Sequence, residues 1–122
     1  MKTDYIIKRS IWRRGGCLRL DMGITQLLNR QGNMCCLGMI CEQAGVPRTS
    51  LFRTVAPWAL IQKDVAIPSD LAWLFIGDSI DGDSVSFNMM VANDDESIDD
   101  SEREATLTAL AAKAGITLTF VD

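Results

Sequence analysis

Residues 99–122 run DDSEREATLTALAAKAGITLTFVD, and this stretch predicts a helix followed by a strand. Four apolar side chains recur at the three- and four-residue spacing of a single helix face: Leu107, Leu110, Ala111 and Ala114. Gly115 follows, and glycine suits the left-handed backbone just beyond a helix end. The next apolar residues alternate with their neighbours, as in a strand that buries one face: Ile116, Leu118 and Phe120. A helix and a strand are therefore the last two predicted elements.

An acidic run, residues 94–104, leads into that helix. Asp99 stands three residues before Glu102, which predicts a capping box, and negative charge favours a helix N-terminus. Residues 93–104 also match part of an EF-hand calcium loop, but Ile98 occupies the position where a glycine makes the sharp turn. We therefore favour a solvated, helix-capping loop over a calcium site.

The predicted sheet comes from both ends of the chain. An apolar, extended stretch begins at Tyr5–Ile7 and continues through Ile11–Trp12, before the basic turn Arg13-Arg14-Gly15-Gly16. We expect the strand at residues 116–121 to pair with it. Residues 21–28 fit a short helix and a strand about equally, so both alternatives stay open for this segment.

Short helices are predicted between the two strands. The clearest spans Cys36–Ala44, with a glycine at its end. Thr49 and Ser69 are expected to cap two further short helices, and residues 85–92 favour a helix over a strand. The fold class is therefore α+β, with a small sheet of the N-terminal and C-terminal strands covered by several short helices.

Length and composition indicate a single domain over residues 1–122. Hydrophobic residues make up 48% and charged residues 23% of the chain, which is typical of a globular protein and not of a disordered one. Every apolar run falls short of the roughly 18 residues that cross a bilayer. Met1–Tyr5 lacks the layout of a signal peptide. We therefore expect a cytoplasmic protein without membrane contact.

Four cysteines stand at positions 17, 35, 36 and 41. Adjacent Cys35 and Cys36 suit a disulfide framework poorly, and their apolar neighbours Met34 and Leu37 favour buried thiols. A reducing compartment follows. Zinc is the weaker interpretation, because only Cys17 is left as a fourth ligand, at no recognisable spacing.

The sequence contains no histidine, so the usual general base and the commonest metal ligand are absent. It also contains no glycine-rich phosphate loop and no nucleophile elbow. We assign no catalytic residue, no metal ligand and no cofactor. A thiol-dependent enzyme that uses Cys35, Cys36 or Cys41 stays as an alternative to a binding protein.

Charge is distributed unevenly along the chain. Residues 1–63 carry ten lysines and arginines against three acidic residues, a balance of +7. Residues 64–122 carry two against thirteen, a balance of −11. The two halves can pack together, or they can keep a basic and an acidic face apart for partners of opposite charge. Both interpretations stay open.

Two candidate surfaces follow from the second interpretation. The acidic surface is expected to bind a basic partner: Asp94, Asp95, Glu96, Asp99 and Asp100. The alternative basic patch would bind nucleic-acid phosphates: Arg9, Arg13, Arg14 and Arg19. Trp12 could stack on bases there, although a core position is its simpler interpretation. The net charge of −4 argues against nucleic acid as the partner.

Six short motifs are spread along the chain: Trp12-Arg13-Arg14-Gly15, Cys35-Cys36-Leu37-Gly38, Asn93-Asp94-Asp95, Glu102-Arg103-Glu104, Gly115-Ile116 and Phe120-Val121-Asp122. Together they resemble a group of small uncharacterised proteins from phage and prophage genomes. The middle of the chain matches that group poorly. The resemblance implies a phage-encoded protein that acts in the bacterial cytoplasm.

Small accessory proteins in that setting often bind and block a host protein, defence complexes included. The leading hypothesis is therefore a non-enzymatic accessory protein that binds a host protein or protein complex through its acidic half. It would inhibit a bacterial defence system, as an anti-CRISPR does. The sequence carries no sign of the oligomeric state.

Overall fold

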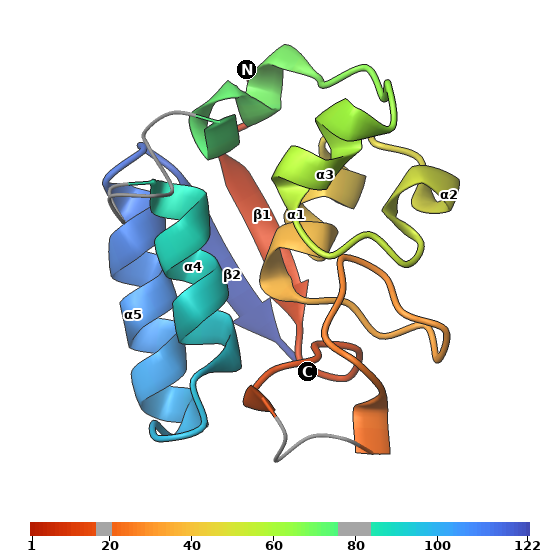
Figure 1. Cartoon of the computed structure of the whole chain (residues 1–122). Helices are drawn as coiled ribbons and strands as arrows, with labels where there is room; N and C mark the ends of the chain where they lie inside the picture. The colour runs from red at the N-terminus through yellow and green to blue at the C-terminus, as the bar shows by residue number, and fades with distance from the viewer. Residues whose placement is uncertain (17–20, 76–83) are drawn as a thin grey trace.

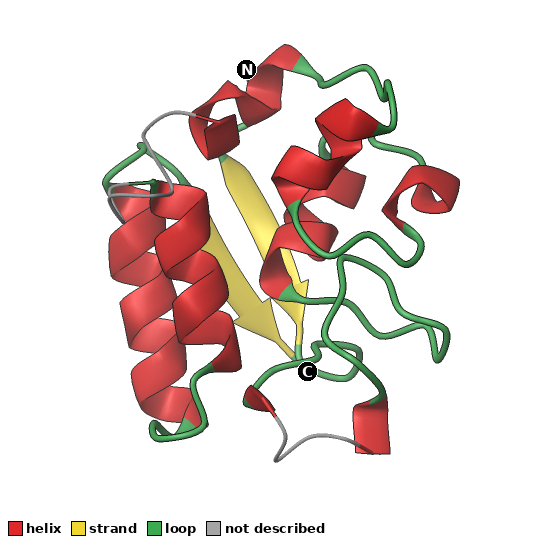
Figure 2. Ribbon diagram, in the orientation of Figure 1, coloured by secondary structure: helices red, strands yellow, loops and turns green. Residues whose placement is uncertain are grey.

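The computed structural model describes residues 1–16, 21–75 and 84–122. Its elements, in chain order, are β1 (Asp4–Lys8), α1 (Cys36–Gln43), α2 (Arg48–Leu51), α3 (Pro57–Gln62), the 3-10 helix η2 (Ser69–Phe75), α4 (Val85–Asp94), α5 (Asp100–Ala112) and β2 (Thr117–Val121) (Figure 1). The predicted α+β class is confirmed, because the two end strands form one small sheet and short helices accompany it (Figure 2).

The two strands run parallel, so Tyr5 lies beside Leu118 and Ile7 beside Phe120. Tyr5, Ile7 and Leu118 are buried, whereas Ile6 between them is exposed, so the sheet buries one face. Parallel neighbours need a long crossover connection. Here the helices between the two strands supply it.

A side chain covers the free edge of β1. The Gln43 side-chain oxygen, at the end of α1, accepts a hydrogen bond from the Ile6 N–H at 2.8 Å. The amide nitrogen of the same side chain donates to the Ile6 carbonyl at 2.6 Å. Gln43 thus satisfies backbone groups that an edge strand leaves unpaired.

The helices form two groups beside the sheet. α4 and α5 lie side by side, with α5 against β2, and α1 packs against β1 (Figure 1). α4 also contacts α1, which joins the two groups. The core lies between them, and its fully buried side chains include Trp12, Leu37, Ile40 and Met89. Among the described residues, no helix is long and apolar enough to span a membrane.

Predicted features appear at several helix ends. Asp99 caps α5, because its carboxylate accepts a hydrogen bond from the Glu102 N–H at 2.8 Å. α4 is the helix favoured for residues 85–92, and Ser84 caps it through the Phe87 N–H. Gly45 has a φ of 109°, the left-handed conformation expected beyond α1.

The predicted extension of the first strand is wrong. β1 ends at Lys8, where the chain turns and the Ile11 N–H donates to the Lys8 carbonyl at 3.2 Å. Trp12 forms only an isolated bridge with Met34. The turn breaks the extended backbone that a continuous strand needs.

Two other segments also differ from expectation. Thr49 does not cap α2, because the helix already begins at Arg48, after Pro47 in an extended conformation. The Pro47 carbonyl accepts the first hydrogen bond of the turn, from the Ser50 N–H at 3.0 Å. Residues 21–28 form neither an α-helix nor a strand.

Candidate functional site

Two arginines of the predicted basic patch, Arg13 and Arg14, are buried and contribute no exposed surface. Arg13 is 2% exposed, and its guanidinium donates to three backbone carbonyls, those of Arg14, Gly16 and Gly23. Arg14 is 8% exposed, and its guanidinium lies 4.5 Å from the centroid of the Trp12 ring. These two side chains hold the turn together and do not face solvent.

Arg9, another member of that patch, is paired with carboxylates. Arg9 forms ion pairs with Glu104 on α5, at 2.8 Å, and with Asp122, at 3.0 Å. Arg19 lies outside the described residues. The pairs of Arg9 connect the basic half of the chain with the acidic half, so the two halves pack together along this seam.

Asn93, at the end of α4, is a buried polar residue that connects three segments. Its side-chain oxygen accepts hydrogen bonds from the Trp12 indole N–H at 2.7 Å and the Cys36 N–H at 3.2 Å. Its side-chain nitrogen donates to the Arg13 carbonyl at 3.0 Å. Asn93 thus ties α4 to the N-terminal turn and to the start of α1. The calcium-loop alignment would make Asn93 a ligand, but two N–H donors occupy its oxygen.

Arg103, on α5, supports the end of α4 in a similar way. Like Asn93, it was not among the candidate site residues predicted from the sequence. It is 2% exposed, and its guanidinium donates to four backbone carbonyls, those of Ala92, Asn93, Asp95 and Ile98. Carbonyls at a helix end have no donor within the helix. The one available signal was that Arg103 is one of only two cations in residues 64–122.

Asp94 and Asp95 lie at the end of α4 in different environments. Burial raises the pKa of Asp94, and a hydrogen bond from the Asn93 side chain, at 2.9 Å, opposes that rise. The pKa of Asp95 is lowered instead, because the Ser97 hydroxyl and N–H both donate to its carboxylate, at 2.6 and 2.8 Å. Asp95 therefore stays ionised at neutral pH, and the ionisation of Asp94 is the more sensitive of the two to a fall in pH.

The remaining members of the predicted acidic surface divide into two groups. Asp99 and Asp100 support the fold: Asp99 caps α5, and Asp100 forms ion pairs with Arg14 at 3.1 Å and with Arg103 at 3.5 Å. Glu96 is exposed in the loop between α4 and α5. The structure therefore brings Asp94, Asp95 and Glu96 to one end of α4, whereas Asp99 and Asp100 make contacts that stabilise the fold.

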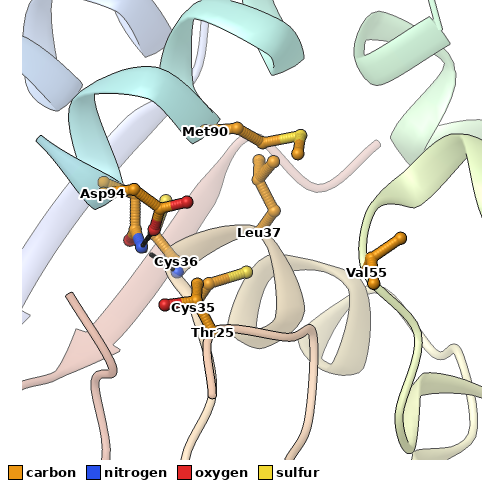
Figure 3. Close-up of a pocket in the computed structure, with 8 residues that line it drawn as sticks. Thr25, Cys35, Cys36, Leu37, Val55, Met90 and Asp94 are labelled. Carbon is orange, nitrogen blue, oxygen red and sulfur yellow. Dashed lines mark hydrogen bonds between the residues drawn. The ribbon is translucent and has the colours of Figure 1, made fainter. Parts of the chain in front are cut away.

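Two adjoining hollows on α4 share Met90 and Asp94. Figure 3 shows the first, where Leu37 and Cys35 lie between these α4 residues and Val55 on the opposite side. The second extends along α4. We call the joined surface the α4 groove, defined by Thr25, Cys35, Leu37, Val55, Phe87, Met90, Val91, Asp94 and Asp95.

The α4 groove combines exposed apolar side chains with carboxylates. Phe87, Val91 and Val55 are 39%, 53% and 55% exposed, values that leave much of each side chain open to contact. The hollow in Figure 3 encloses only about 30 Å³, far below the roughly 300 Å³ of a small-molecule pocket, and the second hollow, of about 540 Å³, is wide open to solvent. The groove therefore suits contact with a macromolecule better than enclosure of a substrate.

The cysteines in the described residues carry buried thiols, as predicted. Cys35, Cys36 and Cys41 are buried and not joined in disulfides. Burial raises the pKa of Cys35 and Cys41 to about 12 and also raises that of Cys36. These thiols are therefore protonated at neutral pH and are poor nucleophiles. Cys17 lies outside the described residues.

Comparisons with models of protein families, with curated protein sequences and with solved structures found no match to this chain. Within the part of the chain that the structure describes, no three His, Cys, Asp or Glu side chains are grouped as a metal site would require. The geometry of the described surface is therefore the basis for a functional proposal.

Proposed function

We propose that this chain is a non-enzymatic binding protein whose α4 groove engages a basic, apolar-bearing segment of a partner protein. One observation carries the proposal: exposed Phe87 and Val91 share a hollow with the carboxylates of Asp94 and Asp95. Apolar side chains of the partner would bury against the first pair, and its lysines or arginines would face the second pair.

The two kinds of contact have different roles in this proposal. Buried apolar contacts supply most of the affinity of a protein interface. Carboxylates at its rim steer a basic partner toward the groove and set its orientation. Asp95, with its lowered pKa, supplies a permanent charge for that purpose at neutral pH.

The resemblance to phage proteins supports a setting for this binding. A phage-encoded accessory protein meets host proteins in the bacterial cytoplasm, and proteins that hold nucleic acid carry basic surfaces. We therefore propose a host protein or protein complex as the partner and inhibition of a defence system as the result, in the manner of an anti-CRISPR. The acidic end of α4 would occupy a surface that otherwise binds phosphates.

The two alternative functions have less support. A thiol-dependent enzyme needs a thiolate, whereas burial keeps the pKa of Cys35 and Cys41 at about 12. A nucleic-acid binder that uses the N-terminal turn needs exposed cations, whereas Arg13 and Arg14 are buried. Neither group is placed for the chemistry that its alternative requires.

The proposal is tested in two steps. Affinity capture from a bacterial host lysate, followed by mass spectrometry, identifies the partner protein. Calorimetry then measures how tightly the purified partner binds. Val91→Ser removes apolar surface from the groove, and Asp95→Lys reverses one of its charges. Each variant is expected to weaken binding of that protein about tenfold or more, because a central interface contact contributes roughly 1–2 kcal/mol.

Two control substitutions make the same two types of change on other surfaces of the protein. Ile61→Ser, on α3, alters a side chain that is 55% exposed, close to the 53% of Val91. Asp4→Lys reverses an exposed charge on β1. Both controls should bind the partner like the unaltered protein. Equal losses in controls and groove variants, or full binding by both groove variants, would exclude the α4 groove.

A further inference from the structure

A second concave surface is lined by two arginines whose side chains have no hydrogen-bond or ion-pair partner in the described part of the chain. This hollow of about 270 Å³ lies between the turn at residues 29–33 and the turn after α2. It has none of the residues that define the α4 groove. Its polar and apolar walls include Ile24, Gln26, Arg30, Gln31 and Arg53. We call it the arginine hollow.

One wall of the arginine hollow is held rigidly by Asn29, which is 1% exposed. The Asn29 side-chain oxygen accepts hydrogen bonds from the N–H groups of Gln31 at 3.0 Å and Asn33 at 2.9 Å. Its side-chain nitrogen donates to the carbonyls of Met22 at 2.8 Å and Ile24 at 2.9 Å. The wall is therefore organised before any ligand binds, which lowers the entropic cost of binding.

Contacts from two other segments complete the support. Buried Arg13 donates to the carbonyl of Gly23, on the same wall. On the opposite wall, the Arg53 N–H donates to the Leu28 carbonyl at 2.7 Å. Arg53 has a φ of 60°, which is uncommon for a residue other than glycine and recurs at ligand sites. The backbone thus holds Arg53 at the hollow in a costly conformation.

Within the described structure, the two guanidinium groups make no hydrogen bond or ion pair that stabilises the fold. Arg30 and Arg53 are exposed, and neither side chain has a hydrogen-bond or ion-pair partner among residues 1–16, 21–75 and 84–122. Arg9, by contrast, is paired with carboxylates. Two guanidinium groups on one rigid hollow, without a carboxylate among its lining residues, form a site of positive charge.

We propose that the arginine hollow binds a phosphate monoester. Such a group carries a charge of about −1.5 to −2 at neutral pH, which matches two arginines, whereas a carboxylate carries only one charge. Guanidinium groups donate pairs of hydrogen bonds to phosphate oxygens. The side-chain amides of Gln26 and Gln31 can add donors, and Ile24, which is 70% exposed, offers an apolar contact to the rest of the ligand.

Titration of the ¹⁵N-labelled full chain with inorganic phosphate, followed by NMR at constant ionic strength, tests this proposal. Saturable shifts are expected at the backbone amides that line the hollow, Gly23, Gln31 and Arg53 among them. Arg30→Gln and Arg53→Gln should each weaken phosphate binding about tenfold, the loss of one charge-assisted contact. Lys113→Gln, at the end of α5, removes an equal charge elsewhere and should leave binding unchanged.

Three further ligands identify the source of the phosphate. Adenosine monophosphate and a phosphoserine peptide carry the same group as inorganic phosphate, and acetate provides a single-charge comparison. Tighter binding of either phosphorylated ligand than of inorganic phosphate would identify which one uses the Ile24 contact, and equal binding would identify the phosphate alone as the ligand. Acetate binding as tight as phosphate binding, shifts that do not saturate, or equal losses in Lys113→Gln would overturn the proposal. Because the arginine hollow has none of the groove's residues, these outcomes leave the α4 groove untouched.

Discussion

Two groups of arginines in this protein have opposite roles. Arg13, Arg14 and Arg103 are buried and donate to backbone carbonyls or to carboxylates. Arg30 and Arg53 are exposed around a shared hollow and bond to no described side chain or carbonyl. A cluster of arginines in a sequence therefore does not by itself locate a binding surface. What each guanidinium contacts in the folded chain decides its role.

The buried arginines have a physical reason to be where they are. Burial of a charge is costly unless hydrogen bonds and counter-charges compensate it. Turns and helix ends offer such compensation, because their carbonyls lack donors within regular structure. A guanidinium has five N–H donors and can satisfy several of these carbonyls at once. The N-terminal turn and the end of α4 use arginine for this purpose.

The largest expected effect comes from substituting one of the buried arginines. Arg103→Met keeps the size of the side chain but leaves four carbonyls without their donor and Asp100 without one ion pair. We expect the free energy of unfolding to fall by about 3–5 kcal/mol, measured by urea denaturation. Lys113→Met, at the exposed end of the same helix, should cost under about 0.5 kcal/mol. Equal losses in the two variants would mean that Arg103 does not hold these segments together.

A smaller effect is expected at Asp94, which senses the charges of Arg13 and Arg103. Burial raises its folded-state pKa above 3.8 despite those charges, so the ionised form costs stability at neutral pH. The cost disappears as the pH falls through the raised pKa. Asp94→Asn should therefore stabilise the fold by about a few tenths of a kcal/mol near pH 7, after allowance for solvent screening.

That gain should vanish in urea denaturation well below the ordinary aspartate pKa of about 3.9, where Asp94 is neutral in the folded and the unfolded chain alike. Asp95→Asn is the matched comparison, because the folded-state pKa of Asp95 is lowered. Its charge stabilises the fold above the unfolded pKa, and this contribution is lost as the pH falls, so the substitution should destabilise at neutral pH only. A gain from Asp94→Asn that persists at low pH would contradict a cause in the ionised carboxylate.

The smallest effect is expected in the exposed pair. Arg30→Gln and Arg53→Gln should leave the free energy of unfolding unchanged within the roughly 0.5 kcal/mol scatter of surface substitutions, because no described contact depends on either guanidinium. Urea denaturation of the variants used for phosphate titration measures this directly. A loss above about 1 kcal/mol in either variant would place that arginine with the structural group.

Prediction from sequence succeeded where neighbours along the chain decide the structure. The apolar stripe of α5, its Asp99 cap and the alternation in β2 each depend on residues only a few positions apart. The buried thiols of Cys35 and Cys36 also followed from their apolar surroundings. The pairing of the two end strands was predicted as well, but not that they run parallel.

Prediction failed where distant segments meet. Asn93 and Trp12 are 81 positions apart, and no local pattern indicates that their side chains share a hydrogen bond. The same holds for Arg53 at the arginine hollow, whose N–H donates to the distant Leu28 carbonyl from a left-handed backbone conformation. Asp100, a member of the predicted acidic surface, pairs with Arg14 from the other end of the chain, which no local pattern indicated either.

The sequence by itself determined the α+β class, the main helix ends and the excess of acidic residues in the second half, because local periodicity and composition suffice for these. Only the tertiary structure decided which charged side chains are paired within the fold and which remain exposed on its surface. The physical reason is that a charged side chain is buried or exposed according to the carbonyls and counter-charges that folding brings to it. Those partners come from segments that the linear sequence keeps apart.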